Sequence, residues 1–158
     1  MEINQINKLT SSANNFEFLK AESQKYWKNV ELDIYDGLQI QQGSKWNKGL
    51  SDNDLNDFQK KLGIEFTPSL IYYFKTMNGL DKLEIDISSN LNEPKFSISM
   101  FKYPESINTI KNYMESVFEN FDAINSNEFV PNILPYYGNR YLILDKQEEV
   151  LSIMNDII

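Results

Sequence analysis

Cysteine and histidine are both absent from the 158 residues of this chain. Without thiols or imidazoles the chain has no disulfide, no thiol nucleophile, no histidine general base and none of the usual zinc ligand sets. Catalysis would have to use carboxylates, Tyr, Lys, Ser or Thr, as in a glycosidase carboxylate pair or a Ser–Lys dyad. The absences narrow the possible chemistry without excluding every enzyme.

Positive charge is scarce, because 23 acidic residues stand against 15 basic ones and Arg140 is the only arginine, which gives a net charge of −8. A surface of this sign opposes binding to nucleic acid and to anionic membranes. Acidic surfaces serve solubility in many proteins, and they also complement basic protein partners. Composition leaves both interpretations open.

Long apolar runs are missing too. No segment of the sequence approaches the roughly 20 apolar residues that cross a bilayer. The N-terminal stretch MEINQINKLTSSANN has neither the basic start nor the apolar centre of a signal peptide. We therefore expect a cytoplasmic protein. The apolar fraction of 41% suits one domain over residues 1–158.

Two consecutive helices are predicted between Trp46 and Gly79. Ser51 is a preferred N-cap residue, and Asp54 three positions later completes a capping box. Gly63 supplies the left-handed residue that ends this first helix. Its apolar face follows helical spacing at Leu55, Phe58 and Leu62.

The second helix begins with a cap, Thr67, and a first-turn proline, Pro68. Asn78 and Gly79 are expected to stop it. Its apolar face consists of Leu70, Ile71, Phe74 and Met77.

The N-terminal section, residues 1–30, is predicted to be helical, with a short docking helix within 1–15 and a longer helix from Phe16. The packing face of the longer helix is Phe16, Leu19, Ser23, Tyr26 and Val30, with Trp27 adjoining. An irregular extended passage follows over 32–40, with a turn at Asp36–Gly37.

Period-two alternation predicts an antiparallel pair of strands with one buried face. The buried positions are Leu83, Ile85 and Ile87 on one strand and Phe96, Ile98 and Met100 on the other. Helical spacing returns over 104–125, and further strands are predicted at 129–134, 141–144 and 150–154, a final helix being the alternative for the last. These elements predict an α+β fold with a mostly antiparallel sheet of about four to six strands covered by helices.

Two blocks of residues resemble the SUKH superfamily, also called the Smi/Knr-like family. The first block is Trp46, Gly49, Leu50, Ser51, Leu55, Phe58, Leu62, Gly63, Phe66, Pro68, Tyr72, Tyr73, Phe74, Asn78 and Gly79. The second is Ile133, Leu134, Pro135, Gly138, Arg140, Tyr141 and Leu142. The chain departs from the family at Thr67, where many relatives carry proline, and at Asn139, where some carry histidine.

The superfamily includes a yeast cell-wall-synthesis regulator and many bacterial proteins that neutralise toxins. The resemblance implies a non-enzymatic immunity protein of a polymorphic toxin system, which occludes a cognate toxin domain, such as a basic nuclease, without a cofactor or metal. The motif residues then serve packing, Trp46 included, although an exposed tryptophan could also stack on a ligand. The alternatives are an intracellular regulatory or scaffold domain and a small carboxylate-based enzyme or ligand-binding domain.

Six residues are candidate contacts for a protein partner: Asp52, Asp54, Glu84, Asp86, Tyr137 and Arg140. Asp52 and Asp54, with Asp57, either present charge to a basic partner or complement the dipole at the start of their helix. Glu84 and Asp86 are expected on the solvated face of their strand. There they either bind a cation, act as acid and base, or are simply hydrated.

Arg140 lies in a loop rich in tyrosine, at Tyr136, Tyr137 and Tyr141. This combination suits either a buried ion pair or an anchor for a protein partner.

Overall fold

The computed structural model describes residues 12–88, 93–98, 100–124, 132–137, 140–144 and 149–152. These residues contain four helices and eight short strands. The helices are α2 (Ala13–Trp27), α3 (Asp52–Leu62), α4 (Pro68–Thr76) and α5 (Ile107–Ile124). The predicted α+β class is confirmed. No helix in these residues is long and apolar enough to span a membrane.

All strand pairs in the described residues are antiparallel, as predicted, and they form three small sheets. The first has the order β1 (Leu38–Gln39), β4 (Glu84–Asp86) and β5 (Lys95–Ser97). The second pairs β2 (Trp46–Lys48) with β3 (Met77–Leu80), and the third has the order β6 (Ile133–Tyr137), β7 (Arg140–Ile143) and β8 (Val150–Ser152). Each sheet has two or three strands, fewer than the four to six predicted for a single sheet.

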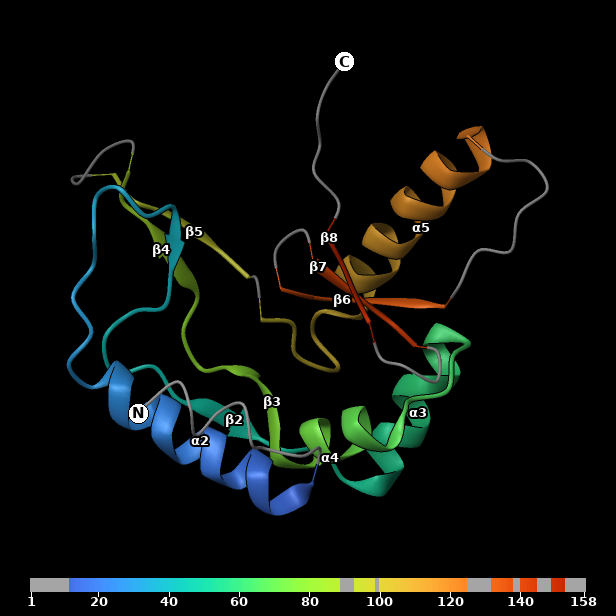
Figure 1. Ribbon diagram of the computed structural model, residues 1–158, viewed down its shortest axis with the longest axis horizontal. Helices are drawn as coiled ribbons and strands as arrows, with labels where there is room; N and C mark the ends of the chain where they lie inside the picture. Colours follow the sequence, from blue (N-terminus) through green and yellow to red (C-terminus); the bar gives the residue numbers. More distant parts are fainter. Residues whose placement is uncertain are drawn as a thin grey trace.

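Figure 1 shows how these parts are arranged. Helices α2, α4 and α3 lie along one edge of the molecule with β2 and β3, and the third sheet lies beside α5. The first sheet extends away from the helices as an arm, which comprises residues 31–40, 83–88 and 93–98. We refer to it as the β1–β4–β5 arm.

The predicted start and stop signals of α3 and of the start of α4 are confirmed. Ser51 caps α3 in a complete capping box with Asp54, and Gly63 ends it in the left-handed conformation at φ 70°. The side chain of Thr67 accepts the backbone N–H of Leu70 at the start of α4. These local hydrogen bonds satisfy backbone donors that a helix leaves without partners.

The predicted end of α4 is wrong. Asn78 and Gly79 do not stop the helix, because α4 ends at Thr76 and the chain passes directly into β3, which contains both residues. Gly79 has φ 65°, and a Cβ there would lie 2.7 Å from the Cβ of Lys102. Glycine is thus required by the close approach of the segment before α5.

The main core surrounds Phe58, whose side chain is completely buried. Its ring meets Phe66 and Phe74 edge to face, with centroids 5.1 and 5.2 Å apart, and stacks on Tyr103 at 4.5 Å. Such aromatic pairs contribute about 0.5–1.5 kcal/mol each beyond the burial of their area. This cluster joins α3, α4 and the segment before α5.

Trp46 packs against helices, as its motif role predicts. Its indole N–H donates to the Ser23 hydroxyl of α2 at 2.8 Å, and its ring lies 6.2 Å from that of Tyr73 in α4. Trp27 is buried and its ring lies 5.4 Å from Trp46, whereas Tyr26 is 69% exposed. The prediction that Tyr26 packs inward is therefore wrong.

Helix α2 begins earlier than predicted, at Ala13, because Ser12 caps it. The predicted docking helix falls largely on residues 1–11, which lie outside the described part of the chain. Helix α5 begins later than predicted, at Ile107, and buries Ile110, Met114 and Val117.

Strands β7 and β8 confirm the strands predicted at 141–144 and 150–154 within the residues described. Strand β6 includes only Ile133 and Leu134 of the strand predicted at 129–134 and continues to Tyr137. The predicted tyrosine-rich loop is therefore wrong for Tyr136, Tyr137 and Arg140, which lie in β6 and β7. Residues 150–152 form a strand, so the alternative of a helix there is wrong.

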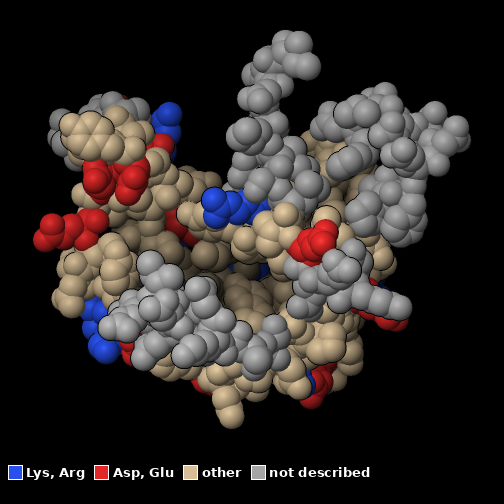
Figure 2. Space-filling view, in the orientation of Figure 1, with Lys and Arg blue, Asp and Glu red and all other residues tan. Residues whose placement is uncertain are grey.

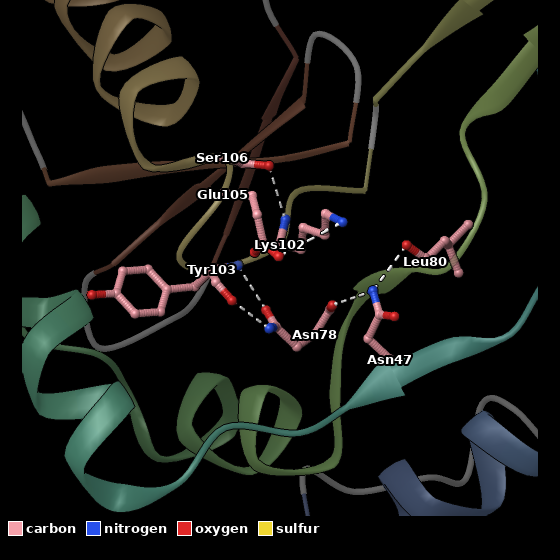
Figure 3. A network of polar contacts seen from close by, with 7 residues as sticks. All are labelled: Asn47, Asn78, Leu80, Lys102, Tyr103, Glu105 and Ser106. Atoms are coloured by element: carbon pink, nitrogen blue, oxygen red, sulfur yellow. Dashed lines mark hydrogen bonds and ion pairs between the residues drawn. The ribbon is translucent and has the colours of Figure 1, made fainter.

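A buried side-chain amide connects β3 to the segment before α5 (Figure 3). Asn78 donates to the Tyr103 carbonyl at 2.7 Å and accepts the Tyr103 backbone N–H at 2.9 Å. Asn47 in turn donates to the carbonyls of Asn78 and Leu80, at 3.1 and 2.9 Å. Ser106 accepts the backbone N–H of Lys102 at 3.2 Å. The Asn78 side chain thus joins β3 to a segment with which β3 forms no strand pair in the described residues.

Asn78→Ala is expected to destabilise the fold by about 3 kcal/mol, because it leaves two buried backbone groups of Tyr103 without partners at about 1–3 kcal/mol each. Urea unfolding measures the change. Asn56→Ala, at an exposed position of α3, is the control and should change stability by less than about 0.5 kcal/mol. Equal effects of the two substitutions would contradict this role of Asn78.

Candidate functional site

The acidic start of α3 is engaged within the protein. The Asp54 carboxylate accepts the Ser51 backbone N–H at 3.2 Å and its hydroxyl at 2.6 Å. Asp52 forms an ion pair with Lys75 at 2.5 Å, and its side chain is 79% exposed. Both residues thus have a structural role at the helix N-terminus, and their contact with a partner stays a prediction.

Asp57 belongs to a small polar cluster with Lys61 and Tyr103. The Tyr103 hydroxyl donates to the Asp57 carboxylate. The Lys61 ammonium lies 2.8 Å from that carboxylate and donates to the Tyr103 hydroxyl at 3.0 Å. The hydrogen bond from Lys61, and then that from Tyr103, lowers the pKa of Asp57, whereas burial raises the pKa of Tyr103. The cluster fixes the rim of the aromatic core.

Glu84 does not lie on a solvated face, so this prediction is wrong. The residue is 2% exposed, and its carboxylate accepts the Met100 backbone N–H at 3.1 Å. Ile85 beside it is also buried, at 8% exposure. The chain returns over Glu84 at residue 100, which strand periodicity does not reveal.

Asp86 is partly exposed and uses its carboxylate locally. It accepts the hydroxyl of Ser88 at 2.6 Å and the Ser88 backbone N–H at 2.8 Å. The hydroxyl hydrogen bond is the largest cause of the lowered pKa of Asp86. Because Glu84 is buried, the two residues do not form an exposed carboxylate pair.

Tyr137 and Arg140 are brought together as partners across the β6–β7 hairpin. The Arg140 guanidinium lies 5.9 Å from the centre of the Tyr137 ring, within cation–π range. Arg140 is exposed while its neighbour Tyr141 is buried, as strand alternation requires. The interpretation as a buried ion pair is therefore wrong, and an anchor for a protein partner is the remaining one.

The candidate contacts do not form one surface. Asp52 and Asp54 lie on α3, Asp86 lies on the β1–β4–β5 arm, and these two regions are at opposite sides of the molecule (Figure 1).

An apolar cavity of about 380 Å³ lies among α2, α4, α5 and the third sheet. Its described lining includes Phe16, Trp46, Tyr73, Phe74 and Tyr136, and it contains no charged residue. The cavity has the size and apolar character of many small-molecule sites. It does not gather the pair of carboxylates that the carboxylate-based enzyme alternative requires. The described residues also hold no group of three acidic side chains able to bind a metal ion.

The arm exposes side chains that alternation predicted to be buried. Leu83, Phe96 and Ile98 are 45%, 54% and 39% exposed, which corrects the prediction of a buried face for these three residues. On the same face only Ile85 and Ile87 are buried, at 8% and 7% exposure. Sequence reasoning missed this surface because alternation shows which residues share a face but not whether anything covers it.

Comparison of the chain with protein-family models, with curated proteins and with solved structures found no match. The resemblance to the SUKH superfamily stays a prediction.

The polar cluster gives a pH-dependent prediction for Asp57→Asn. The lowered pKa of Asp57 means that its ionised form stabilises the folded state above the unfolded pKa of about 4. This stabilisation is lost as the pH falls through the folded pKa. We expect the wild-type protein to have a higher urea midpoint than the variant at neutral pH, with the difference shrinking in acid.

Glu115→Gln is the control, since Glu115 is an exposed carboxylate of α5. It should show no comparable change with pH. A difference between wild type and Asp57→Asn that stays constant into strong acid would contradict the assignment.

Proposed function

We propose that the protein is a non-enzymatic immunity protein that binds a toxin domain and blocks it by occlusion. The observation that carries this proposal is the combination, on the arm, of exposed large apolar side chains with acidic ones. Such a surface supplies both the buried contacts and the charge complementarity of a protein interface. The resemblance to the SUKH superfamily supports a toxin domain as that partner.

The net charge of −8 supports a basic partner. Opposite charge accelerates encounter between proteins and weakens binding to wrong partners. A nuclease domain, which must itself attract nucleic acid, has the required positive surface.

The motif residues support the proposal indirectly, because most of the described ones have packing or capping roles, Tyr72 and Arg140 being exposed. Ser51, Gly63, Thr67 and Pro68 define helix ends, and Phe58 and Phe74 form the core. The function is therefore assigned to the surface and not to the motif. A regulatory or scaffold domain would use the same kind of surface on a host protein.

The proposal is tested by co-expressing the protein with the C-terminal domain of the protein whose gene lies immediately upstream of its own. We expect a one-to-one complex on size-exclusion chromatography with light scattering, and relief of the toxicity that this domain causes alone. Affinity should fall by about tenfold or more between low and high salt, because exposed charges are screened.

The absence of both a complex and relief of toxicity would contradict the immunity function for that pair. A pull-down with the intact protein that yields only host proteins would favour the regulatory alternative.

A further inference from the structure

The β1–β4–β5 arm concentrates the exposed apolar surface of the described residues. Eleven large apolar side chains are exposed over all the residues described. Six of them belong to the arm: Leu32, Ile34, Tyr35, Leu83, Phe96 and Ile98. Single exposed apolar residues are ordinary on proteins, but a group of them marks an interaction surface.

The strand register places Leu83, Phe96 and Ile98 on one face of the sheet. Phe96 lies opposite Ile85 in the β4–β5 pair, so the two share one face of the sheet. Leu83 and Ile98 follow on that face because each lies two positions from one of these residues. Strand β5 is at the edge of its sheet, and no other described strand pairs with its outer side. An extended segment of a partner can therefore add to it as a further strand.

The loop beside the sheet holds Ile34 and Tyr35 outward in a fixed arrangement. The side-chain amide of Gln39 donates to the carbonyls of Asp33 and Asp36, at 2.6 and 2.8 Å, and its oxygen accepts the Asp33 backbone N–H at 2.7 Å. Ile34 is 45% exposed and Tyr35 is 88% exposed. A loop ordered before binding loses less entropy when a partner docks.

Acidic residues outnumber basic ones on the arm, and we refer to its exposed and partly exposed acidic residues as the acidic rim. The arm carries five exposed or partly exposed acidic residues and one basic residue, Lys95, among the residues described. The acidic ones are Glu31, Asp33, Asp36, Asp86 and Glu93. Figure 2 shows acidic side chains at this end of the molecule, next to uncharged surface. A partner that covers the apolar groups must pass this acidic rim, which favours lysine and arginine.

We propose that the arm binds a basic segment of a partner protein that presents apolar side chains, added in extended form along β5. The identity of that partner as a toxin domain rests on the proposed function. The apolar side chains of the segment cover Phe96 and its neighbours, and its basic side chains face the acidic rim. Phe96 is the aromatic anchor on β5, and Tyr35 offers a second aromatic contact from the loop before β1, at the other edge of the sheet.

Titration of the isotope-labelled protein with a synthetic peptide of alternating lysine and valine tests the arm directly. We expect amide shift changes confined to residues 31–40, 83–88 and 93–98. A peptide of alternating glutamate and valine, with the same apolar content, should bind about tenfold or more weakly because it meets like charge. Equal binding of the two peptides, binding of neither, or shifts centred elsewhere would overturn the proposal.

Neutralisation by variants is the second test, with the upstream toxin domain as the probe. Phe96→Ala should weaken binding by about tenfold or more, as expected for an aromatic anchor. Tyr35→Ala should also weaken binding. Because Tyr35 is 88% exposed, this substitution leaves the core intact. Tyr72→Ala on α4 is the matched control, since Tyr72 is 40% exposed and lies outside the arm.

The outcomes separate this inference from the proposed function. If wild type and both arm variants neutralise equally, the arm is not the binding surface, and the immunity function stands. If the wild-type protein neutralises nothing, the immunity function fails, and the peptide titration decides the arm on its own.

Discussion

The pair of hydrogen bonds between the Asn78 side chain and the Tyr103 backbone is the constraint on which the rest of the structure depends. Buried backbone groups require partners, and here one amide supplies both a donor and an acceptor. Once Tyr103 is held in place, its ring stacks on Phe58 and its hydroxyl reaches Asp57. A single side chain thus ties the second sheet to α3 and to the start of α5, elements that share no backbone ladder in the described residues.

The arm buries an acidic side chain and exposes an aromatic one, which is the opposite of the usual pattern. The carboxylate of Glu84 is buried while the ring of Phe96, on the neighbouring strand, is 54% exposed. Burying a carboxylate costs free energy that its hydrogen bond to the Met100 amide offsets in part. Because Phe96 is only partly buried, it forgoes part of the roughly 1.5–3 kcal/mol that full burial of a large apolar side chain contributes. A partner of the kind proposed would cover Phe96 and recover this free energy on binding.

Helix ends, which depend on neighbouring residues, could be predicted from the sequence. Burial and hydrogen bonds that depend on residues distant in the chain could not. Ser51, Gly63 and Thr67 act on backbone within a few residues, so their types alone indicated the helix ends. The burial of Glu84 depends on where residue 100 returns in space. The same limit applies to Asn78, whose type suggested a helix stop although its partner is 25 residues away in sequence. Of the candidate contacts, Asp54 has the local capping role that its position indicated, whereas Tyr137 and Arg140, expected in one loop, are cross-strand partners in β6 and β7.

Two glycines of the helical region meet different requirements. Gly63 is needed for its left-handed dihedral, and a Cβ there would meet nothing within 4 Å. Gly49 has ordinary backbone torsion, but a Cβ would lie 1.9 Å from the carbonyl oxygen of Lys75. Asparagine, which enters the left-handed region more readily than other side chains, is therefore an acceptable replacement at 63. Position 49 admits no side chain of any kind, so in a library of random variants these two glycines would show different patterns of tolerance.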